Sequence, residues 1–114
     1  MRKTDKKIDN LLREVLTEVC DIAQQQHEGF EWLTHFANYD SFPNSLNIVV
    51  VFDSNTHLAN ADTDVLLAFI KEKLNVIDIK LKDFTRHVTF DTEERCNVEN
   101  NGKWNDRFQK RGLN

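Results

Sequence analysis

The sequence contains little glycine and proline, and this scarcity limits both its loops and its chemistry. Only three glycines and one proline occur among 114 residues, which leaves little room for long loops. Gly29, Gly102 and Gly112 are too scattered to form a glycine-rich phosphate loop. Nucleotide binding by such a loop is therefore excluded, and we expect no cofactor.

Cysteine is also scarce, and the two thiols cannot form a disulfide framework. Cys20 and Cys96 are expected to be free, as is usual in the cytoplasm. Cys20 falls at the edge of an apolar helical stripe and is predicted to be a packing residue. Cys96 follows Glu93 and Glu94, whose charges should raise its pKa and disfavour a reactive nucleophile.

Long apolar runs are absent as well. No stretch approaches the roughly 18 consecutive apolar residues that a membrane span requires. The charged N-terminus is not followed by an apolar signal segment, so we expect a cytoplasmic protein without a membrane partner. With 39% hydrophobic and 30% charged residues, the sequence predicts one globular domain over residues 1–114.

The charge is unevenly distributed along the chain. Residues 8–64 hold ten acidic side chains against the single basic side chain of Arg13, within an overall net charge of −4. Phosphate contacts supply most non-specific affinity for DNA. This half of the chain is therefore not expected to wrap duplex DNA.

The longest apolar run, residues 46–53, predicts a strand buried on both faces at the centre of a sheet. Residues 5–27 carry an apolar stripe at spacings of three and four and predict a helix that Gly29 ends. Residues 30–39 fit a strand or a helix. We favour a strand paired antiparallel with the central one, because aromatic residues suit sheets.

The second half predicts a further helix, a strand and a helical tail. Residues 54–61 are expected to form a loop, and a helix capped by residues 62–64 runs to about residue 74. Over residues 77–91, apolar residues alternate with polar ones, but they change from odd-numbered to even-numbered positions partway along. This pattern predicts one bulged strand or two short ones. The predicted fold is an α+β two-layer sandwich in the order α-β-β-α-β, with a short C-terminal helical tail.

One candidate for catalysis combines a carboxylate with a histidine. Asp53 ends the central strand, where open α/β sheets place ligands, and either His57 or His87 could join it in general acid–base chemistry. The simpler interpretation is that residues 53–55 form a turn. None of the four histidines has the spacing of a metal site, so we expect no metal.

A second candidate is a surface for single-stranded nucleic acid. Aromatic residues of the tail could stack on bases while basic residues contact phosphates. The candidate residues are Lys80, Lys82, Arg86, Lys103, Trp104, Arg107, Phe108, Lys110 and Arg111. The alternative, which we favour, is that Trp104 and Phe108 anchor the tail on the sheet.

Three segments carry a resemblance to known proteins: Trp32-Leu-Thr-His35, Phe42-Pro43-x-Ser45-Leu46 and Phe90-Asp91-Thr-Glu93-Glu94-x-Cys96. They resemble landmarks of small, uncharacterised proteobacterial proteins, some of which are labelled as regulators of the Fis type. The Fis family is helical, with a helix-turn-helix near its C-terminus. Here the C-terminal half is predicted to be rich in strand and to lack a helix pair joined by a tight turn, so the sequence does not support that label.

Together these patterns predict a small cytoplasmic binding or regulatory module. One hypothesis is association with RNA or single-stranded nucleic acid through the tail. A second is docking of a protein partner on the acidic first helix or on a sheet face, where a homodimer is also expected to form if that face is open. A third is a small hydrolase or transferase that uses Asp53 with His57 or His87.

Overall fold

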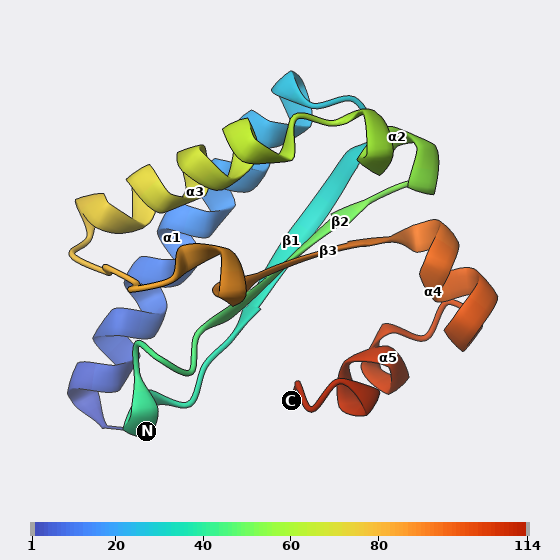
Figure 1. The fold of residues 1–114 in the computed structure, drawn as a ribbon. Coiled ribbons are helices and arrows are strands. Elements are labelled where there is room, and N and C mark those ends of the chain that lie inside the picture. The colour runs from blue at the N-terminus through green and yellow to red at the C-terminus, as the bar shows by residue number, and fades with distance from the viewer. Residues whose placement is uncertain (1, 114) are drawn as a thin grey trace.

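The computed structural model describes residues 2–113 and has the α+β architecture that the sequence predicts (Figure 1). The elements follow in the order α1 (Lys3–Gln26), β1 (Phe30–Phe36), η1 (Tyr39–Ser41), β2 (Asn47–Phe52), α2 (Asn55–Asn60), α3 (Thr63–Val76), η2 (Phe84–His87), β3 (Val88–Thr92), α4 (Glu93–Asn100) and α5 (Trp104–Lys110). None of the helices in this part of the chain has both the length and the apolar character needed to cross a membrane.

The three strands form one mixed sheet with β2 in the middle. β1 pairs antiparallel with β2, with an irregularity between Phe30 and Trp32, and β2 pairs parallel with β3. The side chains from Ile48 to Phe52 are completely buried, as expected for a central strand covered on both faces. The predicted central strand and antiparallel hairpin are therefore confirmed, and the ambiguous segment is a strand over its first seven residues.

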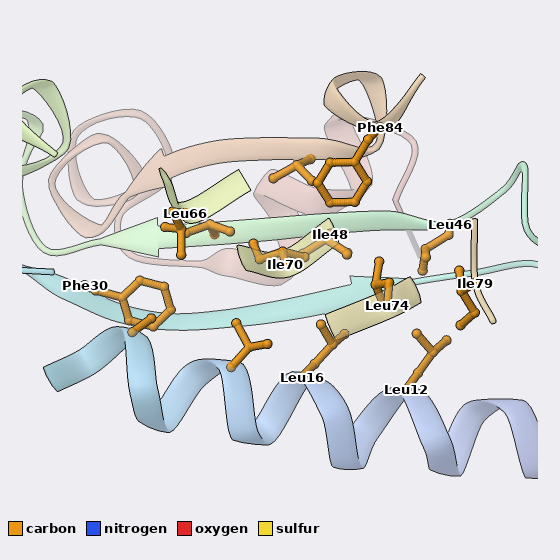
Figure 2. Packing of buried hydrophobic residues seen from close by; sticks show 14 of the residues in the cluster. Leu12, Leu16, Phe30, Leu46, Ile48, Leu66, Ile70, Leu74, Ile79 and Phe84 are labelled. Carbon is orange, nitrogen blue, oxygen red and sulfur yellow. The ribbon is translucent and has the colours of Figure 1, made fainter. Parts of the chain in front are cut away.

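The two long helices lie side by side on one face of the sheet (Figure 1). Leu12 and Leu16 of α1 point toward the sheet, where they meet Ile48 of β2 and Ile70 of α3 in one apolar cluster (Figure 2). The side chain of Asp62 accepts a hydrogen bond from the Val65 amide and caps the start of α3, as predicted. Burial of these apolar stripes holds the helical layer on the sheet.

The strand predicted at the start of residues 77–91 is not formed. Asp78 adopts a left-handed conformation, and the Ile79 amide donates to the Leu74 carbonyl, which closes the end of α3. Ile79 then packs back into the core cluster. Ile79 thus helps to end α3 and is not part of a strand. Only residues 88–92 of this segment pair in the sheet.

The loop predicted at residues 54–61 is also wrong. Residues 55–60 form the short helix α2, and the Ser54 hydroxyl caps it by accepting a hydrogen bond from the His57 amide. In this stretch only Leu58 and Ala61 pack against the core. With so few apolar residues, periodicity could not reveal the helix.

The C-terminal tail covers the second face of the sheet (Figure 1). Phe108 packs on Val49 and Val51 of β2, and Trp104 lies against the same cluster. The anchoring role that we favoured for these two aromatic residues is therefore confirmed. α5 therefore occupies part of the face on which a homodimer was expected, and the homodimer stays a prediction.

The expectation that the C-terminal half lacks a tightly joined helix pair is wrong. Only residues 101–103 separate α4 from α5, and Asn101 and Gly102 both have positive φ. However, Arg107 and Phe108 in the middle of α5 are buried in the chain itself. This helix therefore does not present a free face of the kind that enters a DNA groove.

Candidate functional site

A cleft of about 650 Å³ lies between α1 and β1. β1 is an edge strand, with β2 on one side and no strand on the other. The cleft runs along this open edge, from residues 33–37 of the strand to Tyr39 beyond it. Edge strands expose backbone groups that can pair with another chain, so this cleft combines a pocket with a pairing edge.

One flank of α1 forms the other wall of the cleft. Its lining residues are Asp9, Arg13, Leu16, Thr17, Cys20 and Asp21. These positions follow one another at helical spacing, on the side of α1 away from α3. The opposite flank approaches α3, as the 2.7 Å contact between Glu18 and Lys73 shows. α1 therefore presents one side to the core and one side to the cleft.

Asp9 is the centre of a polar network in the cleft. Its Oδ1 accepts a 2.5 Å hydrogen bond from the Tyr39 hydroxyl and lies 3.4 Å from His35 Nε2, while its Oδ2 lies 3.0 Å from Arg13 Nε. The bond from Tyr39 is the main cause that lowers the pKa of Asp9, so this carboxylate stays charged. Burial and the same carboxylate raise the pKa of Tyr39, which stays a neutral donor.

Two other side chains of α1 reach the backbone of the open edge. The Gln24 amide donates a 2.6 Å hydrogen bond to the Glu31 carbonyl, and the Cys20 thiol is hydrogen-bonded with the Leu33 backbone. Burial raises the pKa of Cys20, so the thiol is protonated and is not an activated nucleophile. The part of the edge beyond Leu33 faces the cleft.

A second constellation lies at the C-terminal end of β2, where the sequence places Asp53 and His57. Asp53 Oδ1 and His57 Nδ1 are 2.6 Å apart, and the second ring nitrogen lies 3.4 Å from Glu28 Oε1. The bond with Asp53 is the main cause that raises the pKa of His57. A cleft of about 300 Å³, lined by Glu28, His57 and Asp62 among others, adjoins the ring.

The neighbouring backbone explains why this histidine sits where it does. Gly29 has a φ of +84°, and a Cβ at this position would come within 2.5 Å of the His57 side chain. The absence of a side chain at Gly29 thus makes room for the imidazole beside Asp53. Carboxylates beside both ring nitrogens favour the charged imidazolium.

His87 does not join this pair. Its Nδ1 lies 2.7 Å from the Leu46 carbonyl, at the start of β2, whereas Asp53 follows the other end of that strand. Of the two histidines proposed beside Asp53, the structure brings only His57 into contact. Within residues 2–113, no group of three His, Cys, Asp or Glu side chains is placed to hold a metal ion.

The residues predicted to bind nucleic acid do not form one surface. Arg107 and Arg111 are both engaged with the buried Asp91, and Trp104 donates a hydrogen bond to Glu93. Lys103 and Lys110 are exposed on the tail. Lys80, Lys82 and Arg86 are exposed in the segment before β3, whose buried residues Ile79 and Phe84 belong to the core on the opposite face of the sheet.

Reasoning from the sequence missed the cleft beside β1. The apolar stripe of residues 5–27 leaves Asp9, Arg13, Thr17 and Asp21 on the polar side of the first helix, and nothing in their types indicates a cleft. Their repeat of four residues is the one signal that sets them on a common flank. That β1 leaves an open edge beside this flank depends on strand order, which the sequence does not show.

No protein-family model, curated protein or solved structure matches the chain. The resemblance to small proteobacterial proteins therefore stays a prediction.

Proposed function

We propose that this protein is a binding module that recognises a segment of a partner protein in the cleft between α1 and β1. The observation that carries the proposal is the cleft itself, which lies along an unpaired strand edge and is walled by the flank of a long helix. Specific sites combine apolar contact area with a few placed polar groups. The partly exposed Cys20 and Leu33 supply the first, and Asp9, Arg13 and Asp21 supply the second.

The charge of this wall favours a cationic segment. Asp21 is exposed at one end of the helical wall, and Glu14 and Glu18 add negative charge elsewhere on α1. The positive charge of Arg13 is directed to Asp9 at 3.0 Å. Complementary charge of this kind steers association and makes it sensitive to salt.

The same charge argues against nucleic acid as the ligand of this surface. Phosphate binding requires clustered basic groups, whereas the helical wall of this cleft carries Asp9 and Asp21 beside the single basic residue Arg13. The tail's aromatic residues, which would have to stack on bases, are packed on the sheet. A protein segment is therefore the better candidate.

The experiment is selection of linear twelve-residue peptides from a displayed library against the immobilised chain, followed by affinity measurement with fluorescein-labelled peptides. We expect the selected peptides to be rich in Lys or Arg and to bind more weakly as salt rises. Asp21→Lys, which reverses a charge on the cleft wall, should weaken binding about tenfold, or about 1.4 kcal/mol.

Glu14→Lys is the matched control, because it makes the same charge reversal at an exposed position of α1 that does not line this cleft. Its effect should be much smaller than that of Asp21→Lys. Equal losses in the two variants would show that only the net charge of the helix matters. Peptides unaffected by either substitution would contradict the proposed site.

A second candidate function is general acid–base catalysis by His57, and the 2.6 Å contact with Asp53 is the observation that favours it. A carboxylate that holds one ring nitrogen leaves the other to exchange protons with a substrate or water. Glu28 at this second nitrogen is largely exposed and can be displaced without disturbing buried structure. The chemistry would be hydrolysis or group transfer at a polar, open site.

Hydrolysis of p-nitrophenyl acetate by purified protein tests this function. The wild-type rate should rise with pH as His57 loses its proton, with a midpoint above 6.5, because Asp53 raises the pKa of the ring. His57→Gln should abolish this component, and His87→Gln should retain it. Identical rates in both variants would exclude His57 as the base.

A further inference from the structure

We infer that the cleft receives its partner as a fourth β-strand, added to the open edge of β1. The inference rests on the proposed function and specifies how the same site binds. The added segment is extended, hydrogen-bonded through its backbone to β1, and carries at least one cationic side chain. Three features of the structure support this mode of binding.

The first feature is a mismatch in width between the two layers. Three strands spaced about 4.8 Å apart occupy roughly 14 Å, whereas two helices of about 10 Å diameter occupy roughly 20 Å. α1 and α3 cover one face of a sheet that has only three strands. The helical layer is therefore wider than the sheet by about one strand.

The excess width lies beside β1. The flank of α1 that carries Asp9, Arg13 and Thr17 lines the cleft, so it is not covered by the sheet. A fourth strand placed there would lie next to β1 and over this flank. The sheet would then match the width of its helices.

The second feature is the direction of the backbone groups. Residues two apart in a strand point their N–H and C=O groups to the same side. The contacts of Gln24 with Glu31 and of Cys20 with Leu33 show that these odd-numbered residues face away from β2. His35 shares their parity, so its N–H and C=O, together with the Leu33 carbonyl, face the cleft and are available for pairing.

The third feature is the chemistry of the helical wall of the cleft. Alternate side chains of an added strand would point toward α1, where they meet Leu16, Thr17 and Cys20. A short apolar side chain suits this central position. Asp21 lies at one end of the helical wall and offers an exposed carboxylate to a lysine or arginine of the partner.

A second copy of the chain does not fit this site through its own β1. Pairing the two β1 strands about a two-fold axis perpendicular to the sheet would bring the two α1 helices together on the same face. Packed helices need 8–10 Å between their axes, about twice the spacing of adjacent strands. Since α1 already projects beyond β1, the two helices would collide. A peptide segment without a flanking helix has no such conflict.

Hydrogen exchange and backbone methylation of the selected cationic peptides test the inference. Binding should slow amide exchange of His35 at least about tenfold, because its N–H faces the cleft and is available for pairing with the added strand. Peptides with N-methyl groups on every second residue should lose binding at least about tenfold in one parity and keep it in the other, because only alternate residues of an added strand pair with β1.

Substitutions separate this mode of binding from the proposed function itself. Thr17→Trp places a large side chain on the helical wall of the cleft and should abolish binding. Thr4→Trp, at an exposed position of the same helix outside the cleft, should not. Binding that Thr17→Trp blocks, without protection of the His35 amide and without a parity effect, would overturn strand addition and leave cleft binding intact. Binding that survives Thr17→Trp would overturn both. Concentration-dependent protection of the His35 amide in the free chain would show that a second copy occupies the edge instead.

Discussion

At the residue scale, the most demanding feature is a charge buried beneath the tail. Asp91 has no exposed surface, and its carboxylate receives hydrogen bonds from Arg107 Nε at 2.6 Å and Nη2 at 3.0 Å. Arg111 Nη2 lies 3.0 Å away as well. Burial alone would raise the pKa of Asp91, but these contacts and the Thr92 amide lower it below its usual value.

The buried pair makes the tail part of the folded unit rather than an appendage. We predict that Arg107→Met lowers the free energy of unfolding by about 3 kcal/mol, because it leaves a buried carboxylate with only Arg111 as a charged partner. Urea denaturation monitored by circular dichroism measures this loss. Arg95→Met, at an exposed position of α4, is the control and should cost less than about 0.5 kcal/mol. Similar losses in the two variants would contradict the role of the pair.

The same pair also sets a pH dependence. Because the folded pKa of Asp91 lies below its unfolded value, its contribution is complete above about pH 4 and is lost as the pH falls through the folded pKa. Stability of the wild type should therefore decline in acid. In Arg107→Met the folded pKa rises, so the decline between about pH 5 and pH 3 should be shallower.

At the scale of elements, α5 acts as a third layer on the sheet. Phe108 packs edge-on against Phe36, with ring centroids 5.0 Å apart, and Trp104 packs against Trp32 at 4.9 Å. Glu93 at the start of α4 accepts hydrogen bonds from both indole nitrogens, at 2.7 Å and 3.1 Å. One carboxylate thus joins β1, α4 and α5, which explains how so short a helix stays in place.

We predict that Phe108→Ala lowers the free energy of unfolding by about 3 kcal/mol, since it removes a buried aromatic ring from this layer. Near-ultraviolet circular dichroism should weaken as Trp32 and Trp104 lose their fixed packing. Gln109→Ala, the next residue on the exposed side of α5, should change both measurements little. Unchanged tryptophan signals in Phe108→Ala would indicate that the tail stays in place without this ring.

At the scale of the whole molecule, helices cover the faces of the sheet, but the edge of β1 stays open. α1 and α3 cover one face of the sheet, and α5 covers part of the other (Figure 1). The edge of β1 faces a cleft that the acidic first helix completes. Edge strands need protection against unwanted pairing, and the partial caps from Gln24 and Cys20 provide some of it.

Much of the framework follows from local patterns in the sequence. Three features depend only on neighbouring residues: the apolar stripe of α1, the buried run of β2 and the cap at Asp62. Each can therefore be recognised in the sequence from its spacing or its residue type. The contact between Asp53 and His57 joins residues only four apart. The strand predicted at the start of residues 77–91 is wrong because an alternating pattern of apolar residues cannot distinguish a strand from a helix end whose apolar residues fold back into the core.

Local patterns thus identify the main elements, because helix and strand periods are properties of short segments. Which surfaces stay open depends instead on how those elements pack. The contact of Tyr39 with Asp9 joins residues 30 apart, and that of Arg107 with Asp91 joins residues 16 apart. Such contacts arise only when strand order and helix packing bring distant segments together. The cleft beside β1 exists for the same reason, since it depends on three strands lying beneath two helices.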